Sequence, residues 1–138
     1  MDRVFLDANV LFSAAYRPSS RIRELWSLSE AVMISSLYAV EEARRNLLVH
    51  RPQSLSDFDE LIEQMEIISG LLSEISLPDG INLPEKDIPI LAAAVEAGCT
   101  HLLTGDKQHF DVLFGKSFGG VLVLVPANYL RQFERLDK

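Results

Sequence analysis

The sequence predicts a single α/β domain in which a central, mainly parallel sheet of four to five strands lies between two layers of helices. Three observations support this fold class. Short apolar segments alternate with helical patterns from end to end. These apolar segments lack the period-two alternation of a half-exposed strand. The length of 138 residues is typical of one domain. We therefore expect residues 1–138 to form one domain.

The N-terminal half predicts two strands and four helices. The first strand is β-branched and aromatic, and it stops at Asp7. Ser20 is a favourable N-cap for the second helix, and Pro52 ends the third because proline cannot continue a helix. In chain order, the expected elements are strand 3–6, helix 10–15, helix 22–28, strand 31–34, helix 40–48 and helix 54–68.

The C-terminal half continues the alternation of strands and helices. Residues 72–77 form an ambiguous strand, and residues 78–80 form a strong turn signal. Gly98 is a suitable residue to end the next helix, since glycine adopts the left-handed backbone of a helix C-terminus without strain. The remaining expected elements are helix 88–97, strand 101–104, short helix 110–114, strand 121–125 and a last helix from Pro126 to Phe133.

Composition limits the classes of function and the compartment. Thirteen Lys and Arg against 20 Asp and Glu give a net charge of −7, which disfavours general binding to nucleic acid. A polyanionic substrate would therefore need local basic clusters or bound cations. The single cysteine, Cys99, cannot form an internal disulfide, and a reducing, cytoplasmic setting fits best. The sequence has no signal-peptide pattern and no long apolar run, so we expect neither secretion nor a membrane span.

Four acidic residues are candidates for a catalytic or metal-binding site. Asp7 and Asp106 each follow an apolar strand, and Asp87 lies at the start of a helix. Helix capping explains each of these three equally well when it is considered singly. Glu42 lies at the edge of an apolar helix stripe, where an ion pair with Arg45 is the simpler explanation. If the two strands are neighbours, however, their aspartates project into one cleft at the carboxyl edge of the sheet.

Taken together, five segments resemble the PIN-domain family, and within it the VapC-like toxins of prokaryotic toxin-antitoxin pairs. The resemblance covers nearly the whole chain and implies a three-layer α/β/α fold and a metal-dependent ribonuclease. It implies that the catalytic and metal-binding acids are Asp7, Glu42, Asp87 and Asp106, with Asn9 and Thr104 in support; Glu41 competes with Glu42 for the glutamate position. The segments are residues 6–11, 35–47, 87–94, 103–106 and 123–127.

An acid cluster of this kind favours a bound divalent cation, whatever the family. Carboxylates a few ångströms apart repel each other, and a hard divalent cation removes that repulsion. Ligands that are oxygen only, without His or Cys, suit Mg²⁺ or Mn²⁺ better than zinc. Such ions acidify a bound water and neutralise charge during hydrolysis of a phosphodiester. We expect Asp7 and Asp106 to be direct ligands, whereas Glu42 and Asp87 either hold a second ion or orient the water.

Substrate and partners follow from the same resemblance. Single-stranded or looped RNA is the expected substrate, because its splayed backbone can reach a shallow cleft. The family implies a cognate antitoxin protein and a homodimer. His50 and His101 are expected to be structural. Candidate RNA contacts are Arg21, Arg23, Arg45, Lys107 and His109, and each is also explained as an ordinary surface residue.

Three alternatives remain open at this stage. A degenerate PIN domain would bind RNA or a protein without cleaving. A haloacid-dehalogenase-like phosphohydrolase also places an aspartate after its first strand, but it needs a second aspartate two residues on, where this chain has Asn9. A phosphoacceptor receiver domain would need an acidic pair after the first strand and a lysine after the last, where Pro126 lies.

Overall fold

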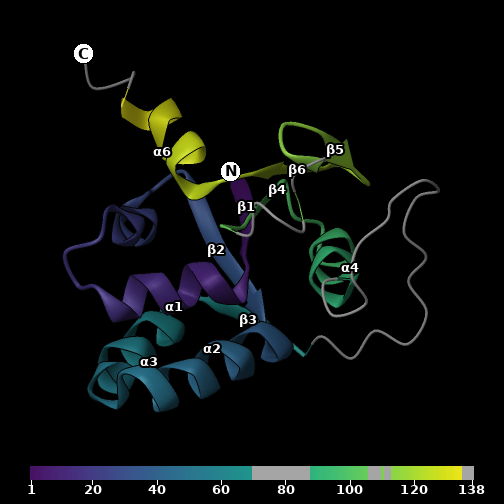
Figure 1. Ribbon diagram of the computed structural model, residues 1–138. Helices are drawn as coiled ribbons and strands as arrows, with labels where there is room; N and C mark the ends of the chain where they lie inside the picture. Colours follow the sequence, from purple (N-terminus) through teal and green to yellow (C-terminus); the bar gives the residue numbers. More distant parts are fainter. Residues whose placement is uncertain (70–87, 106–109, 111–112, 135–138) are drawn as a thin grey trace.

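The structure, a computed structural model, describes residues 1–69, 88–105, 110 and 113–134. Within these residues one sheet contains six strands, rather than the expected four to five, in the order β3-β2-β1-β4-β6-β5 (Figure 1). The strands are β1 (Asp2–Leu6), β2 (Ala31–Ser36), β3 (Glu66–Ile68), β4 (His101–Leu103), β5 (Ser117–Phe118) and β6 (Val121–Leu124). The helices are α1 (Ala8–Tyr16), α2 (Leu37–His50), α3 (Leu55–Glu63), α4 (Ile88–Glu96), α6 (Pro126–Glu134) and the 3-10 helices η1 (Arg21–Ser27) and η2 (Pro52–Ser54).

The sheet is parallel except at one edge. β1 pairs in parallel with β2 on one side and with β4 on the other, and only the β5–β6 pair is antiparallel. After β1 the chain builds outward through β2 and β3, and it then returns to the other side of β1 as β4. The strand order therefore reverses at β1, and at such a point the loops that leave neighbouring strands diverge and open a crevice.

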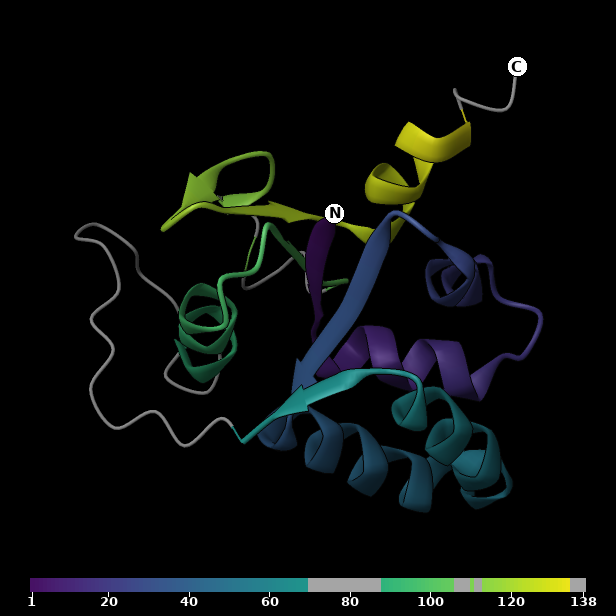
Figure 2. The same ribbon diagram turned by 180° about the vertical axis from the view of Figure 1, so that it is seen from behind.

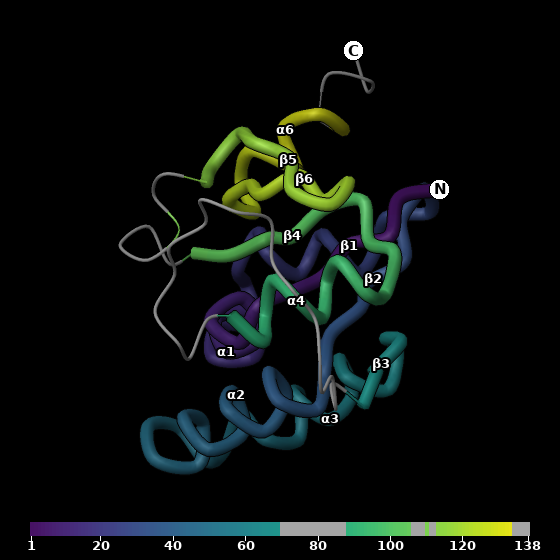
Figure 3. The backbone as a smooth tube through the Cα atoms, turned by 90° about the vertical axis from the view of Figure 1, so that its right-hand side faces the viewer, coloured from purple at the N-terminus to yellow at the C-terminus, as the bar shows by residue number. Residues whose placement is uncertain are grey.

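Helices cover both faces of the sheet, which confirms the expected three-layer α/β/α architecture. In Figures 1 and 2, α1, η1 and α6 lie on one side of the sheet, and α4 lies on the other. Figure 3 is seen from the side of α4, with β1 and β2 behind that helix. Helix α1 packs side by side with α2, which in turn packs against α3. No helix within the described ranges is long and apolar enough to cross a membrane.

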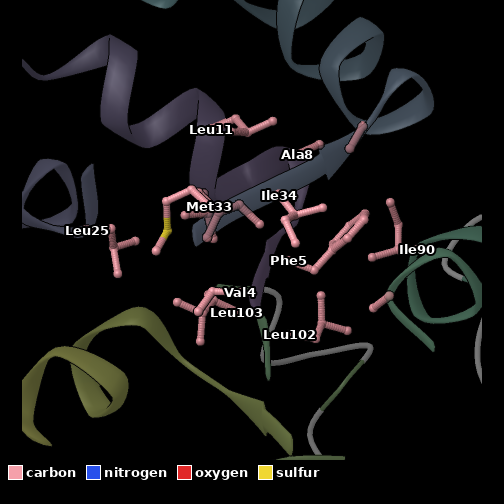
Figure 4. Packing of buried hydrophobic residues seen from close by; sticks show 14 of the residues in the cluster. Val4, Phe5, Ala8, Leu11, Leu25, Met33, Ile34, Ile90, Leu102 and Leu103 are labelled. Atoms are coloured by element: carbon pink, nitrogen blue, oxygen red, sulfur yellow. The ribbon is translucent and has the colours of Figure 1, made fainter. Parts of the chain in front are cut away.

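The buried core explains why apolar and polar residues do not alternate along the strands. Val4, Phe5 and Leu6 are successive residues of β1, and all three are completely buried because helices cover both faces. Figure 4 shows side chains from β1, β2 and β4 packed against residues of α1, η1 and α4, among them Leu11, Leu25 and Ile90. The apolar strand pattern therefore predicted the central sheet correctly.

Local signals in the sequence start and end several helices. The Ser20 hydroxyl accepts a hydrogen bond from the Ile22 N–H, although the segment that follows forms a 3-10 helix. The Ser36 hydroxyl accepts one from the Ala39 N–H and begins α2. Gly98 follows α4 with a φ of 67°, a conformation that favours glycine.

Two strands differ from the expectation. The helix predicted over residues 54–68 ends at Glu63, and residues 66–68 form β3, which pairs in parallel with β2. Apolar residues at 61, 62, 65 and 68 fit a helical period, and a three-residue strand is too short to show a period of its own. The strand β5 was also missed. Gly119 and Gly120, with φ of 56° and 83°, join β5 to β6 as a two-residue hairpin, so the Gly-Gly pair was its signal.

The buried tyrosine of α6 ties the last helix to the first strand. The Tyr129 hydroxyl donates a hydrogen bond of 2.8 Å to Oδ2 of Asp2, and its ring packs edge-on against His101 at 4.8 Å. Burial, reinforced by the hydrogen bond to Asp2, raises the pKa of Tyr129 above its ordinary value, so the phenol stays a donor. Burial also lowers the pKa of His101, against the opposing charge of Asp2.

We expect Tyr129→Phe to lower the free energy of unfolding by about 1–2 kcal/mol, since the lost bond has a charged acceptor that is partly exposed and can be rehydrated. Denaturant unfolding measures this loss. Tyr16→Phe is the matched control: among the described residues the Tyr16 hydroxyl makes no hydrogen bond, so its removal should leave stability nearly unchanged. Equal losses in the two variants would contradict the proposed tie between α6 and β1.

Candidate active site

Asp7 lies at the carboxyl end of β1, where it begins helix α1. Its side chain is only 4% exposed. Oδ1 accepts a hydrogen bond of 2.7 Å from the Ala8 N–H, which makes Asp7 the N-cap of α1. Oδ2 accepts one of 2.8 Å from the Thr104 hydroxyl and one of 3.3 Å from the Asn9 amide. Three donors therefore fix the orientation of this carboxylate.

The same hydrogen bonds join the ends of two neighbouring strands. The Asp7 N–H donates to the Leu103 carbonyl at 3.1 Å, so the β1–β4 pairing extends to the residue after β1. The Asn9 amide nitrogen donates to the fully buried Thr104 hydroxyl oxygen at 3.2 Å, and Asn9 Oδ1 accepts from the Gly105 N–H at 2.7 Å. The structure thus brings Asp7, Asn9 and Thr104 together at the carboxyl ends of β1 and β4.

Glu42 reaches the same site from α2. Helices α1 and α2 begin at the carboxyl ends of the parallel strands β1 and β2, and they lie side by side (Figures 1 and 2). A cleft of about 320 Å³ opens between them. Glu42, Asn46 and His50 line it from α2, since residues four apart share one face of a helix. Its other lining residues are Asp7, Ala8, Asn9 and Phe12.

The two adjacent glutamates of α2 differ in exposure and in whether they line the cleft. Glu42 is half-buried and lines the cleft with Asp7, whereas Glu41 is exposed and does not line it. Consecutive helix residues are about 100° apart around the axis, so only one of the two can face α1. The geometry therefore favours Glu42 as the glutamate of this site.

The other two acids, Asp87 and Asp106, lie outside the described residues. Among the residues that the structure does describe, no three His, Cys, Asp or Glu side chains form a group that could hold a metal ion. The potential metal ligands that line the cleft are nevertheless mainly oxygen atoms, from the carboxylates of Asp7 and Glu42 and the amides of Asn9 and Asn46, beside the ring nitrogens of His50. Such a set fits a hard divalent cation such as Mg²⁺ or Mn²⁺.

The predicted basic contacts are dispersed. Arg23 donates to the Ala14 carbonyl at 2.7 Å and pairs with Asp57 at 3.2 Å, so its guanidinium holds η1 against α1 and α3. Arg21 pairs with Glu24 at 3.7 Å, and Arg45 is exposed on α2. None of these arginines lines the cleft that holds Asp7. Lys107 and His109 lie outside the described residues.

Sequence reasoning missed three residues of the cleft. Phe12 was not singled out, Asn46 appeared only within a matched segment, and His50 was expected to be structural. All three line the cleft, and the His50 ring meets the Phe12 ring edge-on at 6.3 Å. The spacing of Asn46 and His50 from Glu42, four and eight residues, was a signal that could have placed them on one helix face.

Known structures share this fold at low sequence identity. A chain of the VapBC2 complex from Rickettsia felis, bound to a DNA fragment from its promoter, aligns with a TM-score of 0.64 and 13% identity over 88% of this chain and 96% of that one. VapBC-1 from nontypeable Haemophilus influenzae aligns with a TM-score of 0.59 and 14% identity over 91% of this chain and 98% of that one. VapC20 from Mycobacterium tuberculosis is described as a Sarcin-Ricin loop cleaving toxin. It aligns with a TM-score of 0.54 and 12% identity over 75% of this chain and 91% of that one.

Sequence comparison identifies the family more directly. No curated protein sequence matches this chain significantly. The family model described as PIN domain matches residues 3–108, a range that contains β1, the acids of the cleft and β4. The match spans more than half of the chain and agrees with the VapC-like fold, and we conclude that the chain belongs to the PIN-domain family.

Proposed function

We propose that this protein is a divalent-metal-dependent endoribonuclease and the toxin of a toxin-antitoxin pair. The observation that carries the proposal is the placement of Asp7 and Glu42 in one cleft, at the point where the strand order reverses in a PIN domain. The membership of the PIN-domain family removes the support for a haloacid-dehalogenase-like phosphohydrolase. A catalytically silent PIN module is the remaining alternative, and activity measurements distinguish it.

Asp7 and Glu42 would hold Mg²⁺ or Mn²⁺ together with Asp87 and Asp106. When bound, the ion supplies an acidified water and neutralises charge on the phosphodiester as it reacts. Thr104 and Asn9 donate hydrogen bonds to Oδ2 of Asp7 and so restrict the rotation of this carboxylate, which fixes one ligand of the ion. Such hydrogen bonds to a ligand typically affect metal affinity or activity by about 10–100-fold.

The toxin assignment rests on the kind of proteins that share the fold. Two of the similar structures are VapBC complexes, and VapC20 is described as cleaving the Sarcin-Ricin loop. We therefore propose RNA as the substrate, an antitoxin as the partner, a homodimer as the assembly and the cytoplasm as the location. The net charge of −7 is compatible with RNA cleavage because bound cations reverse the field locally at the acids.

Cleavage of a mixed-sequence single-stranded RNA in Mg²⁺ tests the proposal, with the two adjacent glutamates as a matched pair. We expect Glu42→Gln to reduce the single-turnover rate at least about tenfold, because the amide can neither ligate a cation strongly nor accept a proton from water. Glu41→Gln removes the same charge from the same helix turn and should leave the rate nearly unchanged, since Glu41 lies outside the cleft.

Equal rates for the two variants would exclude Glu42 from the active site. If the wild type leaves RNA of every tested sequence intact in Mg²⁺ and in Mn²⁺, the endoribonuclease proposal fails and the silent-module alternative takes its place. Co-expression with the product of a short neighbouring gene tests the toxin assignment separately, because an antitoxin should suppress both growth arrest and RNA cleavage.

A further inference from the structure

An aromatic side chain separates the acidic cleft from a second hollow. Phe12 lies on α1 three residues after Asn9, on the same side of the helix, and its ring lines the cleft that contains Asp7 and Glu42. Phe12 also lines a neighbouring hollow of about 390 Å³. The other residues around that hollow are Ser13, Tyr16, Arg17, Ser20 and Ile22.

The Phe12 ring is held in place by its neighbours but is not fully covered. Its side chain is half-buried and packs against the edge of the core. The Tyr16 ring stacks against it with centroids 5.3 Å apart and planes 28° from parallel. His50 meets it edge-on from α2. A fixed, partly open aromatic ring beside a polar cleft is a suitable surface for stacking a nucleobase.

Charge changes sign from the start of α1 to its end. Asp7 lies at the start of α1, and Glu42 of α2 lines the same cleft there, whereas Arg17 follows the last residue of α1 and lines the second hollow. The Arg51 guanidinium lies over the Tyr16 ring, 5.1 Å from its centroid. Asp7 and Arg17 are ten residues apart, roughly 15 Å along a helix. Acids that attract cations, an aromatic ring and two arginines therefore follow one another from the start of α1 to its end, with α2 contributing Glu42 and the residue after α2 contributing the Arg51 guanidinium.

This order matches the chemistry of single-stranded RNA. We propose that Phe12 stacks on the nucleobase next to the cleaved phosphate, and that Arg17 and Arg51 contact the backbone phosphates beyond it. The inference rests on the proposed ribonuclease function and names how that site positions its substrate. Base stacking tolerates any sequence, so Phe12 would strengthen binding without selecting one base, and the arginines supply the local positive charge that an acidic protein needs for a polyanion.

Binding of an RNA oligonucleotide that carries 2-aminopurine at successive positions tests the inference. The fluorescence of this base falls when it stacks, which reports stacking itself rather than general stability. In an Asp7→Asn background, in which we expect cleavage to be strongly slowed, we expect quenching at one position. Phe12→Leu should abolish that quenching and weaken binding roughly ten- to a hundredfold, whereas Phe12→Tyr should retain both. Phe118→Leu, a half-buried phenylalanine of β5 at the edge of the sheet, is the matched control.

The outcomes separate this inference from the proposed function. If the wild type cleaves RNA but Phe12→Leu binds and quenches like its parent, the stacking site is wrong and the ribonuclease proposal stands. If quenching depends on Phe12 but no metal supports cleavage, the binding site stands without the enzyme. If Phe12→Leu remains folded in thermal unfolding and loses only its affinity for a co-purified protein, the face is a protein contact and the inference is overturned.

Discussion

Asp7→Asn is expected to reduce RNA cleavage by roughly a hundred- to a thousandfold, because it weakens the binding of the cation that would neutralise charge on the reacting phosphodiester. The change removes a negative charge from a buried position and keeps the shape of the side chain. A neutral amide is a much weaker ligand for a hard divalent cation than a carboxylate. Single-turnover cleavage of single-stranded RNA at saturating Mg²⁺ measures the effect.

The fold should tolerate this substitution. Asparagine is as good an N-cap as aspartate, so its carbonyl oxygen can keep the bond to the Ala8 N–H. The amide nitrogen of the variant takes the place of Oδ2. The Thr104 hydroxyl can rotate to accept a hydrogen bond from it, whereas the Asn9 amide nitrogen, itself a donor, loses its acceptor at this position. We therefore expect the free energy of unfolding to change by about 1 kcal/mol or less. Thermal unfolding without added metal checks this point.

A carboxylate outside the cleft provides the control for lost charge. Asp59 is an exposed residue of α3 that pairs with Arg44 at 2.8 Å, and Asp59→Asn should leave cleavage unchanged because exposed pairs contribute little. If Asp7→Asn cleaves RNA as fast as Asp59→Asn does, Asp7 has only its capping role. The helix-capping explanation of Asp7, which the sequence left open, would then be sufficient.

The central part of the site was predictable from sequence because it depends on strand ends. Apolar runs located β1 and β4, and parallel strands bring their carboxyl ends to one edge. The fold class alone did not say that these two strands are neighbours, and their pairing in the structure is what brings Asp7 and Thr104 together. Glu42 could be chosen over Glu41 only through the resemblance to a family. The apolar stripe of α2 gives the buried face of the helix, but it does not say which neighbouring helix covers the edge of that face.

Features that depend on packing between distant segments were not predictable. Residues 66–68 form a strand only because β2 offers a free edge, and the sequence itself fits a continued helix equally well. His50 and Phe12 meet because α1 and α2 lie side by side, and the spacing within either helix cannot show this. Arg23 looked like a substrate contact, and its use in binding Ala14 and Asp57 depends on where η1 lies against α1 and α3.

Removal of divalent metal is expected to abolish RNA cleavage completely and to lower the stability of the folded protein. The carboxylates of the cleft repel each other without a cation, and a ligand that binds only the folded state stabilises it by about 2.7 kcal/mol at a hundred times its dissociation constant. Cleavage should therefore stop in excess chelator and return with Mg²⁺ or Mn²⁺, and the melting temperature should rise as either ion is added.

The variants decide where that ion binds. Asp7→Asn and Glu42→Gln each remove one carboxylate that lines the cleft, so added Mg²⁺ should raise their melting temperatures much less than that of the wild type. Glu41→Gln should retain the full rise, since its side chain lies outside the cleft. A rise of equal size in all four proteins would place the ion elsewhere on this acidic molecule, and undiminished cleavage in excess chelator would exclude a metal mechanism altogether.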